Sequence, residues 1–242
     1  MKTNKRYACL VFDADHTLIK YKQDELAALV VLFKELGLEV DGEGLEFCHA
    51  LSEETWTETG LYDVHDPRIQ KEYHSLYRSH VKGIFEKFFK RYPCSVDPVE
   101  VGKRFLQLLS VGGNLFDGAE QTLAALSDKT GGKYKVYIAT NGVSEIQLGR
   151  LKRLEKYCRK IFVSEDLGVI KPQKEFFAAM LSEISETPQN CLMIGDSLSS
   201  DIAGGNAAGM HTCWFNTRGH QADGSVQPTY EIERLTDLLG LA

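Results

Sequence analysis

Apolar residues along the chain follow two patterns, one typical of buried strands and the other of amphipathic helices. The run from Tyr7 to Phe12 is continuous and short, which is the form of a fully buried strand. Similar apolar runs occupy 134–140, 161–163, 191–195 and 210–215. Helical spacing of apolar residues occupies 119–126, 143–154, 173–184 and 200–208. Strands that alternate with helices predict βαβ units and a parallel sheet.

The stretch between Ile19 and Ser110 shows the helical pattern alone. Apolar residues recur at helical spacing from Leu26 to Leu36, and a glycine follows as a stop signal. Two Asp-Pro pairs, at 66–67 and 97–98, have the form of an N-cap followed by proline in the first turn. We therefore expect four helices, over 24–36, 45–57, 67–88 and 98–110.

These two patterns together predict an α/β fold with an insertion. The helical stretch separates the first strand from all the others. The simplest arrangement is a Rossmann-like, doubly wound parallel sheet with an α-helical domain inserted after the first strand. We expect the α/β core domain to comprise residues 1–19 and 112–242, and the helical domain to comprise residues 20–111.

Composition narrows the range of functions. Of the 242 residues 43% are hydrophobic, which is enough for a core, and the net charge of -6 argues against nucleic acid or an anionic membrane as partner. The six cysteines form no Cys-x-x-Cys pair, and they fit the reduced thiols of a cytoplasmic protein. No apolar run could span a membrane, and no signal-type apolar region follows the basic start MKTNKRY. We expect a cytoplasmic monomer or homodimer that acts on a small molecule.

Two carboxylates directly follow the first strand. Asp13 and Asp15 lie two residues apart, and like charges this close are unfavourable in a dry site unless a cation or a shared proton compensates them. Ligands of open α/β sheets bind beyond the carboxyl ends of the strands, where these residues are expected. The alternative is an acidic loop in which Asp15 caps the following turn.

Polar residues also follow the other predicted core strands. Thr140 and Asn141, before a glycine, form a turn suited to phosphate oxygens or an ordinary strand-to-helix turn. Lys171 follows the third strand, and taken alone it would be a surface charge. Asp196 follows the fourth strand, with Asp201 beyond it, and taken alone it would be an N-cap. Because parallel strands bring these positions to one edge, we expect a phosphoryl-transfer site with oxygen ligands for Mg²⁺.

The segments FDADHTL, ATNG, GVIKP and IGDSLSSDIAGGNAAGM resemble, in order and spacing, the haloacid dehalogenase superfamily of hydrolases. The resemblance covers the α/β core and implies that the helical insertion is a cap domain of the helical type. Within the superfamily, GGNAAG followed by TCWFN is similar to nucleoside 5′-monophosphate phosphatases of the pyrimidine 5′-nucleotidase type and to sugar-phosphate phosphatases.

The resemblance implies catalytic roles for three residues. Asp13 would be the nucleophile and a ligand of Mg²⁺. Asp15 would be the general acid and base, with its backbone carbonyl also on the metal. Lys171 would neutralise the nucleophile and the phosphate.

The resemblance implies binding roles for four more residues. Thr140 and the backbone of Asn141 would hold the phosphate. Asp196 would be the remaining carboxylate on the metal. Asp201 would hold Lys171 or a metal-bound water.

The implied activity is Mg²⁺-dependent hydrolysis of a small phosphomonoester through an aspartyl-phosphate intermediate. A nucleoside 5′-monophosphate is one candidate substrate. Dehalogenases of the superfamily lack a carboxylate at the position of Asp15, and this carboxylate can protonate a leaving alkoxide, which favours phosphate ester hydrolysis. Sugar-phosphate phosphatase, phosphonatase, dehalogenase and non-catalytic binding of a phosphometabolite stay open as alternatives. His16, beside Asp15, either contacts substrate or fills the hinge between the domains.

Overall fold

The computed structural model describes residues 7–217, 219–221 and 224–241. The basic start of the chain, residues 1–6, lies outside these described residues, and the expectation about a signal segment rests largely on that start. Contacts divide the chain into two compact units. The α/β unit comprises Met1–Lys20, Leu115–Ser144 and Leu151–Ala242, and the helical unit comprises Tyr21–Asn114 and Glu145–Arg150.

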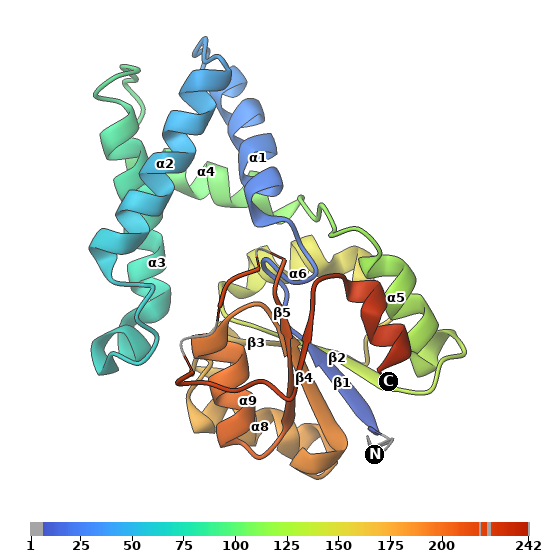
Figure 1. Ribbon diagram of the computed structural model, residues 1–242. Helices are drawn as coiled ribbons and strands as arrows, with labels where there is room; N and C mark the ends of the chain where they lie inside the picture. The colour runs from blue at the N-terminus through green and yellow to red at the C-terminus, as the bar shows by residue number, and fades with distance from the viewer. Residues whose placement is uncertain (1–6, 218, 222–223, 242) are drawn as a thin grey trace. The chain divides into compact units, whose positions relative to one another are not determined.

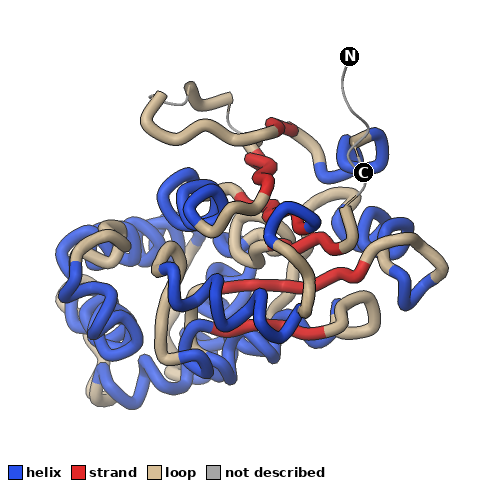
Figure 2. The backbone as a smooth tube through the Cα atoms, turned by 90° about the horizontal axis from the view of Figure 1, so that it is seen from below, coloured by secondary structure: helices blue, strands red, loops and turns tan. Residues whose placement is uncertain are grey.

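The α/β unit is built on a six-stranded parallel sheet with the strand order β3-β2-β1-β4-β5-β6 (Figures 1 and 2). The strands are β1 Cys9–Phe12, β2 Lys135–Thr140, β3 Lys160–Val163, β4 Cys191–Gly195, β5 His211–Phe215 and β6 Tyr230–Ile232. At the centre, Phe12 of β1 lies beside Ile138 of β2 and Ile194 of β4. The parallel sheet confirms the predicted α/β class.

Alternate residues of each strand face opposite sides of the sheet. Helices pack against both of these faces. On one face, Leu10 of β1 belongs to the same buried cluster as Leu123 of α5 Ala119–Leu126. On the other face, Val11 belongs to the cluster that contains Phe177 of α8 Lys174–Ile184. All four residues of β1 are buried, as the continuous apolar run predicts for a central strand.

Several elements differ from the pattern-based expectation. The strand β6 and the 3-10 helix η5 Leu235–Gly240 are not predicted, because the three residues of β6 are too few to show alternation. The helix expected over 200–208 is divided into a π-helical turn, η4 Leu198–Ile202, and α9 Ala203–Ala207. A one-turn helix, α7 Ser164–Leu167, follows β3.

The helical unit contains the four expected helices. They are α1 Tyr21–Glu35, α2 Gly42–Thr59, α3 Pro67–Phe88 and α4 Pro98–Ser110. The two Asp-Pro signals act as predicted, since Asp66 accepts a hydrogen bond from the Arg68 N–H at 2.7 Å and Asp97 accepts one from the Val99 N–H at 2.8 Å. No helix among the described residues has the length and apolarity that a membrane crossing requires.

A buried ion pair joins α1 to the end of the helical stretch and to α6 Ser144–Leu151. The Asp24 carboxylate accepts hydrogen bonds from Arg150 Nε at 3.0 Å, Gly113 N at 2.9 Å and Asn114 N at 2.8 Å. The Asp24 and Arg150 side chains are 0% and 1% exposed. A buried charge is tolerated only when partners of this kind compensate it, so Asp24 fixes three segments of the helical unit.

We predict that Asp24→Ala lowers the free energy of unfolding by about 3–5 kcal/mol, because it removes the acceptor shared by Arg150 and two backbone N–H groups. Denaturant titration would measure the change. Asp117→Ala is the matched control, since Asp117 also forms an ion pair, with Lys20 at 2.8 Å, but its side chain is 98% exposed. The control should leave the free energy of unfolding nearly unchanged. Equal losses in the two variants would contradict a special role for the buried pair.

Candidate active site

The predicted site residues lie at one edge of the sheet in the α/β unit. Asp13 follows β1, Thr140 ends β2 and Asp196 follows β4. Because these strands are parallel and adjacent, their carboxyl ends share an edge. Lys171 lies in the segment between α7 and α8 that follows β3.

Lys171 is the buried cation of this edge. Its ammonium group donates hydrogen bonds to Asp13 Oδ1 at 2.6 Å, Asp201 Oδ1 at 2.7 Å and the carbonyl oxygen of Ala139 at 2.7 Å. Three acceptors match the three donors of an ammonium group. Burial opposes the charge, but the two carboxylates outweigh it and raise the pKa of Lys171 above its ordinary value. Lys171 therefore carries a positive charge at neutral pH.

Asp13 is held directly against this cation. Its backbone N–H donates to the carbonyl oxygen of Ile194 at 2.8 Å, which fixes the chain at the end of β1. Burial raises the pKa of Asp13 to about 7, with Lys171 opposing the rise and Asp201 and Asp15 adding to it. One ammonium group thus does not fully offset the combined effect of burial and of the neighbouring carboxylates on Asp13.

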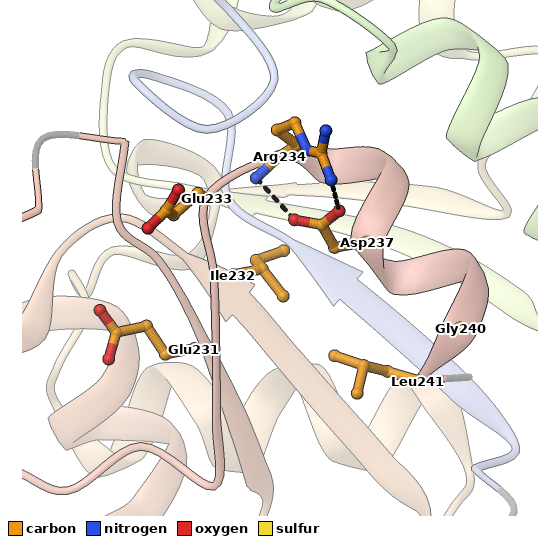
Figure 3. Close-up of a pocket in the computed structure, with 7 residues that line it drawn as sticks. All are labelled: Glu231, Ile232, Glu233, Arg234, Asp237, Gly240 and Leu241. Carbon is orange, nitrogen blue, oxygen red and sulfur yellow. Dashed lines mark hydrogen bonds and ion pairs between the residues drawn. The ribbon is translucent and has the colours of Figure 1, made fainter.

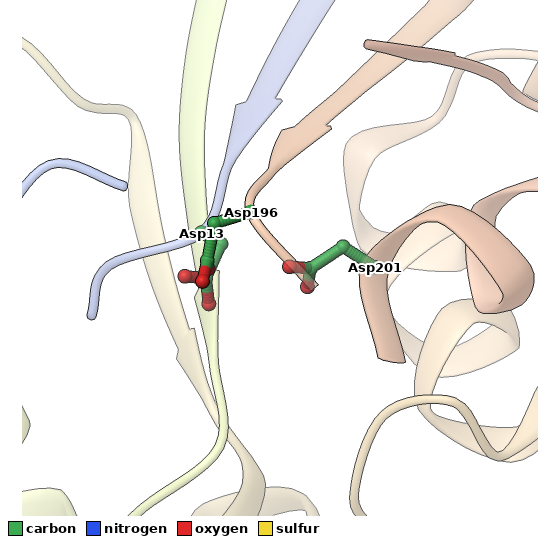
Figure 4. Close-up of side chains that lie close together, drawn as sticks. All are labelled: Asp13, Asp196 and Asp201. Atoms are coloured by element: carbon green, nitrogen blue, oxygen red, sulfur yellow. The ribbon is translucent and has the colours of Figure 1, made fainter. Parts of the chain in front are cut away.

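Three carboxylates form a cluster that could hold a metal ion. Figure 4 shows Asp13 and Asp196 at strand ends, with Asp201 reaching toward them from η4. One oxygen of each lies within 4.8 Å of one oxygen of the others. Burial raises the pKa of Asp196 well above its ordinary value, and the charges of Asp13 and Asp201 add to the rise. Clustered carboxylate oxygens whose charges repel one another suit a hard divalent cation.

Asp201 is engaged mainly with its neighbours in the protein. It accepts from Lys171 at 2.7 Å and from the Ser197 N–H at 3.2 Å. The contact with Lys171 is one of the two expected for Asp201. A Cβ at Gly195 would lie 2.2 Å from Asp201 Oδ2, so the glycine at the end of β4 leaves the room that the Asp201 side chain occupies. Asp13 and Asp196 are therefore the better candidates for cation ligands.

The turn that is predicted to bind phosphate also forms hydrogen bonds with the backbone of Lys171. The side chain of Asn141 accepts from the Lys171 N–H at 2.8 Å and donates to the Lys171 carbonyl at 2.9 Å. This pair of bonds orients the backbone that carries the lysine, a role that the sequence does not predict. The Gly142 N–H donates to the Ser164 hydroxyl at 3.0 Å, and Thr140 is fully buried at the end of β2.

Two side chains that the sequence does not single out hold the Asp196 backbone. Thr17 Oγ1 accepts from the Asp196 N–H at 3.0 Å and donates to Asp196 Oδ1 at 3.3 Å. Trp214 Nε1 donates to the Asp196 carbonyl at 2.8 Å. Thr17 belongs to the Asp-x-Asp-x-Thr motif, so this motif could have identified Thr17 as a site residue from the sequence. Trp214 lies in the TCWFN segment, but the sequence assigns it no role at the site.

The loop after Asp13 contains the other predicted acid and a histidine. Asp15 is half-buried and forms a β-bridge with Ile19. His16 has a φ of 62°, in the left-handed region, and its N–H donates to the Ile19 carbonyl at 2.8 Å. The His16 side chain is exposed beside Asp15.

A separate pocket of about 740 Å³ lies along β6 and η5 (Figure 3). Its lining residues are Glu231, Ile232, Glu233, Arg234, Asp237, Gly240 and Leu241, and they include no predicted site residue. Its one cation, Arg234, is paired with Asp237 at 2.9 Å. An acidic lining whose arginine is already paired does not suit a phosphate group, so the strand-end cluster is the better candidate for the active site.

The family model described as haloacid dehalogenase-like hydrolase matches residues 7–209. HAD-hydrolase YfnB of Bacillus subtilis is 32% identical over 97% of this chain and 94% of that protein. Pyrimidine 5′-nucleotidase PynA of Streptococcus pneumoniae is 31% identical over 96% of this chain and 94% of that protein. The crystal structure of YfnB bound to magnesium superposes with a TM-score of 0.82 and 30% identity over 98% of this chain and 99% of the other.

We predict that Lys171→Met lowers the free energy of unfolding by about 3–5 kcal/mol, because it leaves the buried Asp13 and Asp201 carboxylates facing one another without their shared cation. Lys135→Met is the matched control, since Lys135 pairs with Glu186 at 2.8 Å but is partly exposed. Thermal and denaturant unfolding in metal-free buffer would compare the two. A Lys171→Met protein as stable as the control would show that the site does not depend on this cation.

Proposed function

The chain belongs to the haloacid dehalogenase-like hydrolase family, and we propose that it hydrolyses a small phosphomonoester with the help of Mg²⁺. The observation that carries the proposal is the Lys171 ammonium group, 2.6 Å from Asp13 and 2.7 Å from Asp201 beside the Asp196 carboxylate. Phosphoryl transfer needs a nucleophile and positive charge in the same place. This arrangement supplies both.

Asp13 is the nucleophile in the proposed reaction. A carboxylate oxygen of Asp13 bonds to phosphorus as the bond from phosphorus to the ester oxygen breaks, and Asp15 protonates the departing alkoxide. Water, deprotonated by Asp15, then cleaves the aspartyl-phosphate and releases inorganic phosphate. Lys171 keeps one oxygen of Asp13 in a fixed direction throughout. Thr140 and the backbone of Asn141 hold the phosphate oxygens.

The carboxylates of Asp13 and Asp196, with the backbone carbonyl of Asp15, would hold Mg²⁺. The fit rests on the donor set, which is all oxygen, and on burial together with repulsion among the carboxylates, which raise the pKa of both carboxyl groups. When bound, the ion supplies positive charge that the phosphoryl oxygens need. The magnesium-bound crystal structure of the relative YfnB supports this choice of ion.

A nucleoside 5′-monophosphate is the proposed substrate. Two relatives support it, PynA at 31% identity and pyrimidine 5′-nucleotidase YjjG of Escherichia coli at 30% identity. The helical domain, residues 20–111, would serve as the cap that excludes water from the site in the core domain, residues 1–19 and 112–242. The six free cysteines support a cytoplasmic location.

We predict that the purified protein releases phosphate from pyrimidine nucleoside 5′-monophosphates in Mg²⁺ and loses this activity in excess chelator. Asp13→Asn should lower kcat at least about 10⁴-fold, because the amide cannot form the acyl-phosphate. A malachite-green assay would measure the released phosphate. Asp117→Asn, at an exposed ion pair, is the control for a surface substitution of the same type.

Near-normal activity of Asp13→Asn would contradict the covalent mechanism. Turnover of other phosphomonoesters but of no nucleotide would contradict only the substrate. Metal-dependent binding of nucleotides without turnover would instead favour a binding protein.

A further inference from the structure

The turn that carries Asp196 is held by one side chain from the strand β5 and one from the loop after β1. Trp214 of β5 is the register partner of Gly195, at the end of β4. From there its indole N–H reaches the Asp196 carbonyl oxygen at 2.8 Å. Trp214 is buried, at 4% exposure, so the donor of this hydrogen bond lies in the interior while its acceptor belongs to the half-buried Asp196.

Thr17 holds the same residue from the other side. Its fully buried hydroxyl accepts from the Asp196 N–H and donates to Asp196 Oδ1 at 3.3 Å. The backbone N–H, the carbonyl and the carboxylate of Asp196 are therefore each bonded to a side chain that does not belong to its own turn. An ordinary N-cap residue needs none of these contacts.

The carboxylate of Asp196 needs such restraint for an electrostatic reason. Asp13 and Asp201 lie close enough for one oxygen of each residue to fall within 4.8 Å of the others. Without restraint, the repulsion would favour rotation of the half-buried Asp196 toward water. A site that must receive a cation keeps its ligands in place before the cation arrives.

We propose that Trp214 is a positioning residue for cation binding: its indole N–H fixes the Asp196 carbonyl and, together with the Thr17 hydroxyl, keeps the Asp196 carboxylate facing Asp13. The inference rests on the proposed function, because it takes Asp13 and Asp196 as ligands of a divalent cation. It adds a residue that touches neither the cation nor the phosphate and acts only through Asp196.

A purely structural role for Trp214 makes a different prediction. A buried indole N–H needs an acceptor in any case, and its loss alone would lower the stability of the sheet. That loss would lower the melting temperature equally with and without cation. A positioning role instead changes the concentration of cation at which the protein is stabilised.

The test uses Trp214→Phe, which keeps an aromatic ring and removes the N–H donor. MgCl₂ alone is titrated into the full-length protein, and the melting temperature is followed without substrate. We expect the Mg²⁺ concentration that gives a chosen shift in melting temperature to rise about tenfold, as for the loss of other partners that orient metal ligands. The Mg²⁺ concentration for half-maximal phosphatase activity should rise by a similar factor, and kcat at saturating Mg²⁺ should change less.

The second tryptophan of the chain provides a matched control. Trp56 lies in the helical unit, where its ring packs edge-on against Tyr73 at a centroid distance of 6.4 Å. Trp56→Phe removes an indole N–H far along the chain from Asp196. It should leave the Mg²⁺ dependence of the melting temperature unchanged.

Thr17 gives a second pair of variants, which decides the matter if Trp214→Phe does not fold. Thr17→Val keeps the shape and removes the hydroxyl, and it should weaken Mg²⁺ binding about tenfold. Thr17→Ser keeps the hydroxyl, and it should restore binding to nearly the wild-type value. Equal Mg²⁺ dependence in Thr17→Val and Thr17→Ser would overturn the proposal.

The proposed metal site and the positioning role of Trp214 would be overturned by different results. A wild-type protein that Mg²⁺ neither stabilises nor activates would overturn the proposed metal site and this inference together. A wild-type protein that binds Mg²⁺, with Trp214→Phe binding it equally well, would overturn the positioning role alone. A lower melting temperature of Trp214→Phe, with the same Mg²⁺ concentration needed for a given shift as in the wild type, would also overturn it, in favour of the structural role.

Discussion

The balance of buried charge at the carboxyl edge of the sheet is the constraint on which the site depends. In their ionised forms Asp13, Asp196 and Asp201 bring three negative charges close together, and Lys171 contributes one positive charge, so the fully ionised cluster carries a formal charge of -2. A phosphate ester is itself an anion and would be repelled by such a cluster. A divalent cation brings the formal charge to zero, which explains how an acidic site can accept an anionic substrate.

The site residues form a network of hydrogen bonds in which the residues of each motif are held by residues of another motif. Asn141, at the end of β2, orients the backbone of Lys171, and Lys171 in turn holds Asp13 and Asp201. Thr17 ties the loop after β1 to Asp196. Because these side chains share partners, the effects of substitutions will not add, and the loss of one residue displaces several others.

The sequence predicts those parts of the structure that depend on local patterns and on the topology of the sheet. Continuous apolar runs identify five of the six strands, and the Asp-Pro pairs identify two helix starts. Once the strands are parallel, the predicted site residues meet at one edge without further assumptions. The contacts of Trp214 with Asp196 and of Arg150 with Asp24 could not be predicted, because they join residues 18 and 126 positions apart and no pattern in the sequence pairs them.

Two buried cations organise the two units, and the choice of residue differs for a geometric reason. Arg150 lies along one side of Asp24, where a planar guanidinium can direct its Nε toward a single carboxylate. Lys171 instead serves acceptors from three different parts of the chain, which are Asp13, Asp201 and the Ala139 carbonyl. A compact ammonium group with tetrahedral donors can reach all three from one point, whereas an arginine presents its donors in a flat fork. The shape of the cation, as well as its charge, therefore matters at this site.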